Sequence, residues 1–112
     1  MDCLFCKIIN GEIPSQKVFE NERIYAFKDI SPQAPVHILI IPKEHISSAA
    51  EICEANSKIV SEIFEVAAKL AKDLNLDDGF RIVTNCGEVG CQSVKHLHFH
   101  LLSGEKLSEK MC

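Results

Sequence analysis

Three histidines occupy alternate positions in the segment His96-Leu97-His98-Phe99-His100. In a β-strand, residues two apart point to the same face, so we expect the imidazoles to line one face at ~7 Å spacing. The apolar residues between them would then enter the core. Imidazoles at this spacing would repel one another if all were charged. The pattern therefore indicates chemistry rather than packing alone.

Two kinds of chemistry could use this row of imidazoles. Neighbouring histidines can chelate a catalytic metal that activates water. Alternatively, a neutral imidazole can attack phosphorus directly, while a neighbour fixes its tautomer and stabilises the developing charge. The preceding loop favours the second chemistry. Its Gly87 and Gly90 permit backbone angles that turn N–H groups toward an anion, and Ser93 adds a hydroxyl donor.

The elements that must position these residues are short strands and one long helix. Apolar residues recur at three- and four-residue steps between positions 55 and 74, which predicts an amphipathic helix covering one face of a sheet. Residues 29–35 hold two prolines and must form an irregular loop. Strands are predicted at residues 17–20, 23–28, 36–41 (stopped by Pro42), 80–84 and 94–102. The order predicts an α+β domain with a largely antiparallel, five-stranded sheet.

Length and composition bound the class of protein. The 112 residues predict one domain over 1–112, and 46% hydrophobic with 25% charged residues is ordinary for a soluble globular chain. The net charge of -4 provides no basic stripe, so we expect no polynucleotide partner, whereas a single nucleotide needs only a local site. No signal peptide or membrane span is recognisable, which predicts a cytoplasmic protein that does not enter a membrane.

The histidine segment and the proline-containing loop resemble one known family. Residues 92–102 resemble the signature of the histidine triad (HIT) family, His-φ-His-φ-His-φ-φ, in which φ is apolar. Residues 29–35, followed by His37 and by residues 41–45, resemble the Hint branch of that family. The likeness runs from about Cys3 to Gly104. It implies a HIT-like fold with short helices beside the long one. It also implies a homodimer joined edge to edge, for which the long helix and the strand before it could supply the surface.

The resemblance implies catalytic roles for four residues. His98 matches the nucleophile, which would attack the α-phosphorus, expel an amine or another leaving group, and form a nucleotidyl-imidazole that water hydrolyses. His100 and His37 match positions that orient the nucleophile or contact the phosphate. Ser93 matches a hydroxyl near the leaving group.

The resemblance also implies a nucleotide-binding set. Asp29 matches the carboxylate that accepts hydrogen bonds from the ribose hydroxyls, and Asn85 matches a residue that lines the ribose–phosphate region. Ser93, His98 and His100 also belong to the expected nucleotide-binding set. The apolar slot for the base aligns with residues that could equally be core: Leu4, Phe5, Ile8, Phe27, Ile30 and Leu39. In the phosphate loop, Cys91 stands where a glycine is usual and Cys86 where an acidic residue is common. The backbone donors survive at Cys91 only if a residue with a Cβ can adopt the required angles.

Cysteine spacing predicts a second site. Cys3-x-x-Cys6 is a zinc-type knuckle, and His45 and His96 could complete a tetrahedral set, as equivalent residues do in some members of the family. Four protein ligands leave no position for water, so one structural Zn²⁺ per chain is predicted, and none is required for the chemistry. The alternative is a pair of free thiols. Both His96 and His98 start from the same strand face, so strand twist or an irregularity must separate their tips.

These features give one leading hypothesis and three alternatives. The leading hypothesis is a purine nucleoside phosphoramidase, with adenosine 5′-monophosphoramidate as a generic substrate. The alternatives are a dinucleoside polyphosphate hydrolase, a nucleotide-binding adaptor with incidental turnover, and a metallohydrolase with zinc at His96 and His98. Residues 103–112 lack the Trp-Pro-Pro-Gly ending of some Hint proteins, and this tail influences the choice of leaving group in the family.

Overall fold

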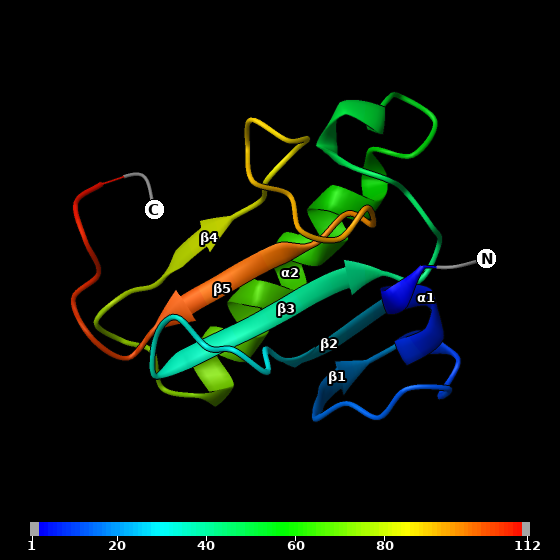
Figure 1. Ribbon diagram of the computed structural model, residues 1–112. Coiled ribbons are helices and arrows are strands. Elements are labelled where there is room, and N and C mark those ends of the chain that lie inside the picture. The colour runs from blue at the N-terminus through cyan, green and yellow to red at the C-terminus, as the bar shows by residue number, and fades with distance from the viewer. Residues whose placement is uncertain (1–2, 111–112) are drawn as a thin grey trace.

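The computed structural model describes residues 3–110, so residues 1–2 and 111–112 of the predicted domain lie outside the described residues. Five strands form one antiparallel sheet in the order β1-β2-β3-β5-β4 (Figure 1). They are β1 (Lys17–Glu20), β2 (Ile24–Lys28), β3 (Val36–Pro42), β4 (Arg81–Val83) and β5 (Phe99–Ser103). The predicted α+β fold and the five-stranded antiparallel sheet are confirmed.

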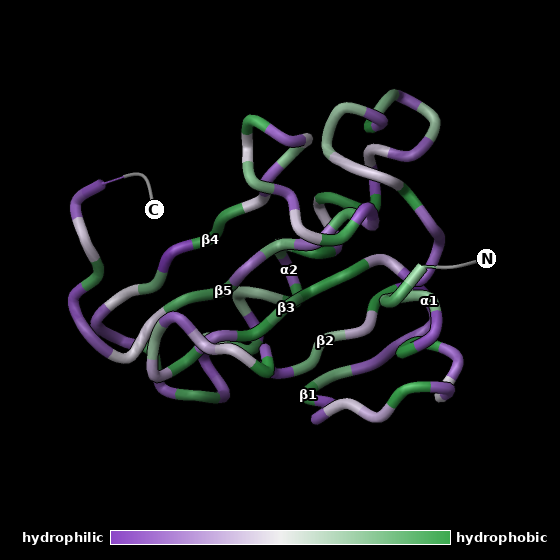
Figure 2. Tube along the Cα trace, viewed as in Figure 1, coloured by the Kyte–Doolittle hydropathy of each residue, from purple (hydrophilic) through white to green (hydrophobic). Residues whose placement is uncertain are grey.

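Alternation along the strands builds two separate cores. In β2, Ile24 and Ala26 point to one face of the sheet, and Tyr25 and Phe27 point to the other. Both faces are covered, so β2 is buried in all four of these positions. The central strand β3 is likewise buried on both faces, and Figure 2 shows most of it as hydrophobic.

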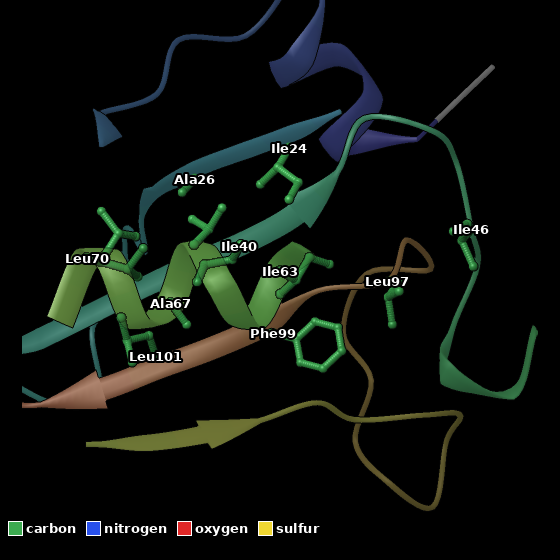
Figure 3. Close-up of a cluster of buried hydrophobic side chains, with 12 residues drawn as sticks. Ile24, Ala26, Ile40, Ile46, Ile63, Ala67, Leu70, Leu97, Phe99 and Leu101 are labelled. Carbon is green, nitrogen blue, oxygen red and sulfur yellow. The ribbon is translucent and has the colours of Figure 1, made fainter. Parts of the chain in front are cut away.

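The long helix α2 (Lys58–Asp73) covers one face of the sheet. Its five buried residues follow the predicted three- and four-residue steps, and four of them meet the strands in a single cluster (Figure 3). Leu97, Phe99 and Leu101 enter this cluster, as predicted from their alternation with the histidines. The helix begins at Lys58 rather than at residue 55, because residues 54–57 form turns. A short 3₁₀ helix, η1 (Ala49–Glu51), precedes it.

The opposite face is covered at one end by α1 (Leu4–Ile9). This helix buries Phe5 and Ile8 against Tyr25, Phe27 and other residues of β2 and β3. At six residues it is too short to show a periodic pattern, and the sequence did not locate it. Its amino-terminal cap is a thiol, because the N–H of Cys6 donates to Sγ of Cys3 over 3.3 Å.

The last strand begins at Phe99, so the predicted strand over 94–102 is wrong in its first half. Residues 94–98 bond outside the ladder. Leu97 N–H donates to the carbonyl of Ile46 at 2.6 Å, and the hydroxyl of Thr84 donates to the carbonyl of His98 at 2.8 Å. The chain bends at residues 94–96. His96 and His98 therefore precede β5, and only His100 lies in it. This bend is the irregularity that the two predicted sites require.

The edges of the sheet are β1 and β4. The strand before α2, which we expected to contribute to a dimer surface, is β3. It lies in the centre and pairs with β2 and β5 on its two sides, so it has no edge to offer another chain. Within residues 3–110, no helix is both long and apolar enough to cross a membrane.

Candidate active site and metal centre

The bend before β5 fixes the tautomer of His98. Nδ1 of His98 lies 2.7 Å from the carbonyl oxygen of His96, and a carbonyl can only accept, so Nδ1 carries the proton. Nε2 therefore keeps its lone pair. His98 is buried, and burial lowers its pKa below the ordinary value, although the hydrogen bond to His96 opposes this. Phe5 meets the imidazole edge-on, with ring centroids 5.1 Å apart. The ring is therefore neutral and held in one orientation, with the lone pair of Nε2 available.

A chain of hydrogen bonds gives His100 the opposite tautomer. The backbone N–H of Gln33 donates to Nδ1 of His37 at 2.9 Å, which leaves the proton of His37 on Nε2. That Nε2 lies 2.8 Å from Nδ1 of His100 and 3.4 Å from a carboxylate oxygen of Asp29, so the shorter bond goes to His100. His100 then accepts at Nδ1 and carries its own proton on Nε2.

Burial keeps these rings neutral. The pKa of His37 is lowered by burial, against the attraction of Asp29. Burial, with the neighbouring His98 and His37, lowers the pKa of His100 to about 4. The rings of His98 and His100 lie 5.1 Å apart. The two adjacent imidazoles are both neutral but differ at Nε2, which carries a lone pair in His98 and a proton in His100.

The register of the sheet arranges the predicted nucleotide-binding residues in rows. Phe27 pairs with Leu39, Leu39 with His100, and His100 with Val83, which gives one row on the face of the sheet that carries the histidines. Phe27 and Leu39 are buried with Phe5 and Ile8 on the α1 side of this row. This brings four of the six residues expected around the base into one apolar cluster.

The other two residues expected around the base lie outside this cluster. Ile30 is 95% exposed and Leu4 is 44% exposed. Asp29, beside Ile30, accepts a hydrogen bond from the N–H of Ser31 and lies beside His37. The carboxylate expected to bind ribose is therefore next to the histidines.

The loop before the histidines is a tight turn. N–H of Cys91 donates to the carbonyl of Glu88, and N–H of Gln92 to that of Gly87, both at 3.0 Å. Cys91 adopts φ 61°, the left-handed region, so a residue with a Cβ does reach the angles of the usual glycine. A Cβ at Gly90 would lie 2.5 Å from the carbonyl oxygen of Cys86, so this position requires glycine.

Some of the expected anion donors are already engaged inside this loop. The backbone N–H groups of Cys91 and Gln92 donate to carbonyls within the turn, and the N–H of Gly87 donates to the side chain of Gln92. By contrast, neither the N–H nor the hydroxyl of Ser93 has a hydrogen-bond partner within residues 3–110. Ser93 is also exposed. It is the loop residue best able to donate to a ligand.

A cavity of about 410 Å³ borders the histidines on the β4 side. It brings the predicted residues His37, His100 and Asn85 together. Its remaining lining residues were not predicted from the sequence: Gln33, Arg81, Val83, Leu102, Leu107 and Ser108. One signal was available for Arg81, which is a lone charge in the strand pattern 80–84 and shares a strand face with Val83.

The predicted metal ligands come together at the amino terminus of α1. Donor atoms of Cys3, Cys6, His45 and His96 all lie within 4.8 Å of one another. Nδ1 of His96 is 3.3 Å from Sγ of Cys3, 3.6 Å from Sγ of Cys6 and 3.2 Å from Nδ1 of His45. A tetrahedral zinc ion with ordinary bond lengths has sulfur–nitrogen edges of about 3.6 Å and nitrogen–nitrogen edges of about 3.3 Å. The four donors fit such an ion.

The protonation of this cluster also suits a metal. Nε2 of His96 lies 2.8 Å from the carbonyl oxygen of Pro42, so the proton sits on Nε2 and the lone pair of Nδ1 faces the thiols. Burial lowers the pKa of His96 and keeps the ring neutral. Burial and the neighbouring Cys3 thiol raise the pKa of Cys6 to about 11, so this thiol would release its proton on binding a cation.

Comparison with known proteins identifies the family of this chain. The family model described as "Scavenger mRNA decapping enzyme C-term binding" matches residues 2–111. A solved HIT family hydrolase from Clostridium thermocellum superposes with a TM-score of 0.96 at 50% identity, covering 99% of this chain and 97% of the other. The chain belongs to the histidine triad family. The likeness of this histidine triad protein to a hydrolase over almost its whole length indicates that it is an enzyme.

Two curated relatives carry more specific names. A "14 kDa zinc-binding protein" of Zea mays is 48% identical over 107 residues, covering 94% of this histidine triad chain and 84% of the maize protein. "Adenylylsulfatase HINT1" of Arabidopsis thaliana is 45% identical over 107 residues, covering 94% of this chain and 73% of the plant protein. The predicted resemblance to the Hint branch is confirmed.

Proposed function

We propose that this protein is a purine nucleoside phosphoramidase that acts through a covalent nucleotidyl-His98 intermediate. The observation that carries the proposal is the pair of opposite tautomers. His98 is held by a backbone carbonyl with the lone pair on Nε2, and His100 is held by His37 with the proton on Nε2. Attack on phosphorus needs a nucleophile, and the charged oxygens need a donor beside it.

The proposed reaction has two balanced steps. Nε2 of His98 bonds to the α-phosphorus as the P–N bond to the leaving group breaks. The leaving nitrogen takes one proton, relayed from water by the Ser93 hydroxyl, and departs as an amine. Water then attacks phosphorus, the bond to Nε2 breaks, one proton returns to solvent, and His98 is again neutral. In both steps Nε2–H of His100 donates to a non-bridging phosphate oxygen.

The nucleoside occupies the β2 side of the histidines. The apolar cluster around Phe5 and Phe27 offers a slot for the base, and Asp29 accepts hydrogen bonds from the ribose hydroxyls. Asn85, which lines the cavity beside His100, contacts the phosphate or ribose. Leu4 and Ile30 are exposed and would close over the edge of the base.

The metal centre is proposed to hold one structural Zn²⁺. Its four protein donors complete a tetrahedron and leave no coordination position for substrate. When bound, the ion ties α1 to the residue before the nucleophile. We place the protein in the cytoplasm, where reducing conditions keep the two cysteine thiols available for a metal.

A homodimer forms part of the proposal, joined through the free edge of β4. In the part of the chain that the structure describes, strand β4 pairs with β5 and has no partner on its other side. An unpaired strand edge is a template for a second copy. Phe64 of α2 is 47% exposed and its ring contacts Phe99, so an apolar surface lies on the α2 side of the sheet.

Rapid quenching after incubation with adenosine 5′-monophosphoramidate labelled in the nucleotide tests the mechanism. We expect an acid-labile adenylyl adduct on His98, and none in His98→Gly. Matched assays with a dinucleoside polyphosphate and with adenosine 5′-phosphosulfate test the substrate class. A wild-type enzyme that cleaves the polyphosphate far faster than the phosphoramidate would overturn the proposed specificity, and full turnover by folded His98→Gly would overturn the mechanism.

A further inference from the structure

Beyond the contacts proposed for Asn85 and His100 with the phosphate or ribose, the cavity on the β4 side of the histidines has no assigned occupant. Among the residues that the structure describes, its lining contains one side chain with a permanent charge, Arg81, and no carboxylate. Arg81 pairs with Leu102, and Leu102 with His37, whose backbone carbonyl accepts from Asp29 N–H. Arg81 and Asp29 therefore lie at opposite ends of one row across the sheet, with the histidines between them.

The guanidinium of Arg81 is held but not neutralised. Its Nη2 donates to the backbone carbonyl of Ser108 over 2.5 Å. Among residues 3–110, its other N–H donors have no acceptor and no carboxylate lies within ion-pair distance. Arg23 differs, because its Nε lies 2.6 Å from the carboxylate of Glu62. A half-buried guanidinium with a fork of open donors is suited to a planar oxyanion.

The direction of the reaction identifies what the cavity receives. The apolar cluster and Asp29 place the nucleoside on the β2 side of the histidines. In a phosphoryl transfer the attacking and leaving atoms lie roughly in line, so the leaving group departs away from the nucleophile. With the β2 side filled by the nucleoside, the cavity that Arg81 lines is the space open to the leaving group.

We infer that Arg81 binds an oxyanion carried by the leaving group, a carboxylate or a sulfate, and so selects acidic leaving groups over neutral ones. The inference rests on the proposed function, since it assigns the second half of the same substrate. Arg81 acts on specificity through charge-assisted hydrogen bonds and takes no part in bond breaking.

Three substrates of one nucleoside test this inference. The first is the adenosine 5′-phosphoramidate of β-alanine, whose leaving group carries a carboxylate. The second is the phosphoramidate of β-alanine amide, which has nearly the same shape but a neutral leaving group. The third is adenosine 5′-phosphosulfate. The measured quantity is kcat/KM for each anionic substrate divided by kcat/KM for the neutral one. The ratio cancels any loss of folded protein. We expect Arg81→Gln to lower at least one ratio about 10-fold or more, since a hydrogen bond to a charged group is lost.

Two further variants sharpen the result. Arg81→Lys keeps the positive charge but lacks the paired N–H donors of the guanidinium. It should therefore recover only part of the ratio that Arg81→Gln loses. Arg23→Gln removes an arginine away from the cavity and should leave both ratios within about twofold of wild type.

The outcomes separate this inference from the proposed function. If the wild type hydrolyses the substrates and neither ratio falls in Arg81→Gln, the inference is wrong and the proposed function stands. If the ratio falls equally in Arg23→Gln, the effect is one of net charge and the inference is also wrong. If the wild type hydrolyses none of the three, the proposed function fails, and the inference fails with it. The ratio that falls tells whether carboxylate or sulfate is preferred.

Discussion

Replacing His37 by two different side chains isolates its hydrogen bond to His100. His37→Leu removes both ring nitrogens, whereas His37→Gln keeps an N–H donor at about the position of Nε2. Both variants leave the N–H of Gln33 without its acceptor, so the variants differ chiefly in the donor to Nδ1 of His100. This makes His37→Gln the matched control for His37→Leu.

The expected magnitude follows from the 2.8 Å bond between Nε2 of His37 and Nδ1 of His100. Leaving a buried acceptor unsatisfied costs about 1–3 kcal/mol, which is roughly 5- to 150-fold in rate if the bond orients the ring in the transition state. We expect kcat/KM on adenosine 5′-monophosphoramidate to fall by this factor in His37→Leu. We expect His37→Gln to recover most of the loss.

The assay is steady-state hydrolysis, combined with ¹⁵N NMR of the imidazoles to read the tautomer of His100. The NMR signal should show the proton on Nε2 in the wild type and in His37→Gln, and a mixture of tautomers in His37→Leu. Equal rates for the two variants, at equal folded fractions, would refute the role given to the Gln33–His37–His100 chain. So would a wild-type His100 with its proton on Nδ1.

Three further predictions concern the metal, pH and the ribose. Cys3→Ser should lower the melting temperature of the zinc-loaded protein by about 5 °C or more and make it insensitive to chelators, whereas Cys53→Ser, at an exposed position, should do neither. The folded-state pKa of His100, about 4, lies below its ordinary 6.5, so the unfolded chain binds more protons between these pH values. Urea titrations should therefore show the free energy of unfolding falling as pH drops from 6.5 to 4. His100 contributes at most about 3 kcal/mol of this fall before solvent screening, and His37, His96 and His98, whose pKa values are also lowered by burial, add to it; a rise would contradict the assignment. Asp29→Asn should weaken kcat/KM roughly tenfold for a ribonucleoside phosphoramidate but not for its 2′,3′-dideoxy analogue, and equal losses would exclude contact with the ribose.

The sequence predicted the fold because its main signals are local. Alternation in β2 and β3 and the steps of α2 are written in neighbouring residues, and the buried sets follow them. The metal ligands were also predictable, since Cys3-x-x-Cys6 is a short motif and the resemblance supplied His45 and His96. The structure brings all four together.

What the sequence could not show depends on contacts between distant segments. Three histidines in alternation indicate one strand face, but the bend before Phe99 arises because Leu97 N–H bonds to Ile46 and His96 to Pro42. The strand propensity of a segment does not predict hydrogen bonds to distant parts of the chain. Arg81 was overlooked for a similar reason, since its cavity exists only where the tail at Ser108 returns to β4.

His96 carries two tasks on one residue. Its ring faces the cysteines, and its carbonyl accepts the Nδ1 proton of His98, the proposed nucleophile. A rotation of this residue by a few tens of degrees would misdirect His98 even with every catalytic side chain present. A protein without the two cysteines would need another contact to hold this peptide, and a graft of the three histidines onto another scaffold would need the bend and that contact as well as the rings. Oxidation of Cys3 and Cys6, which are far from the histidines in the sequence, would then alter the position of His98, because His96 contacts both the thiols and His98.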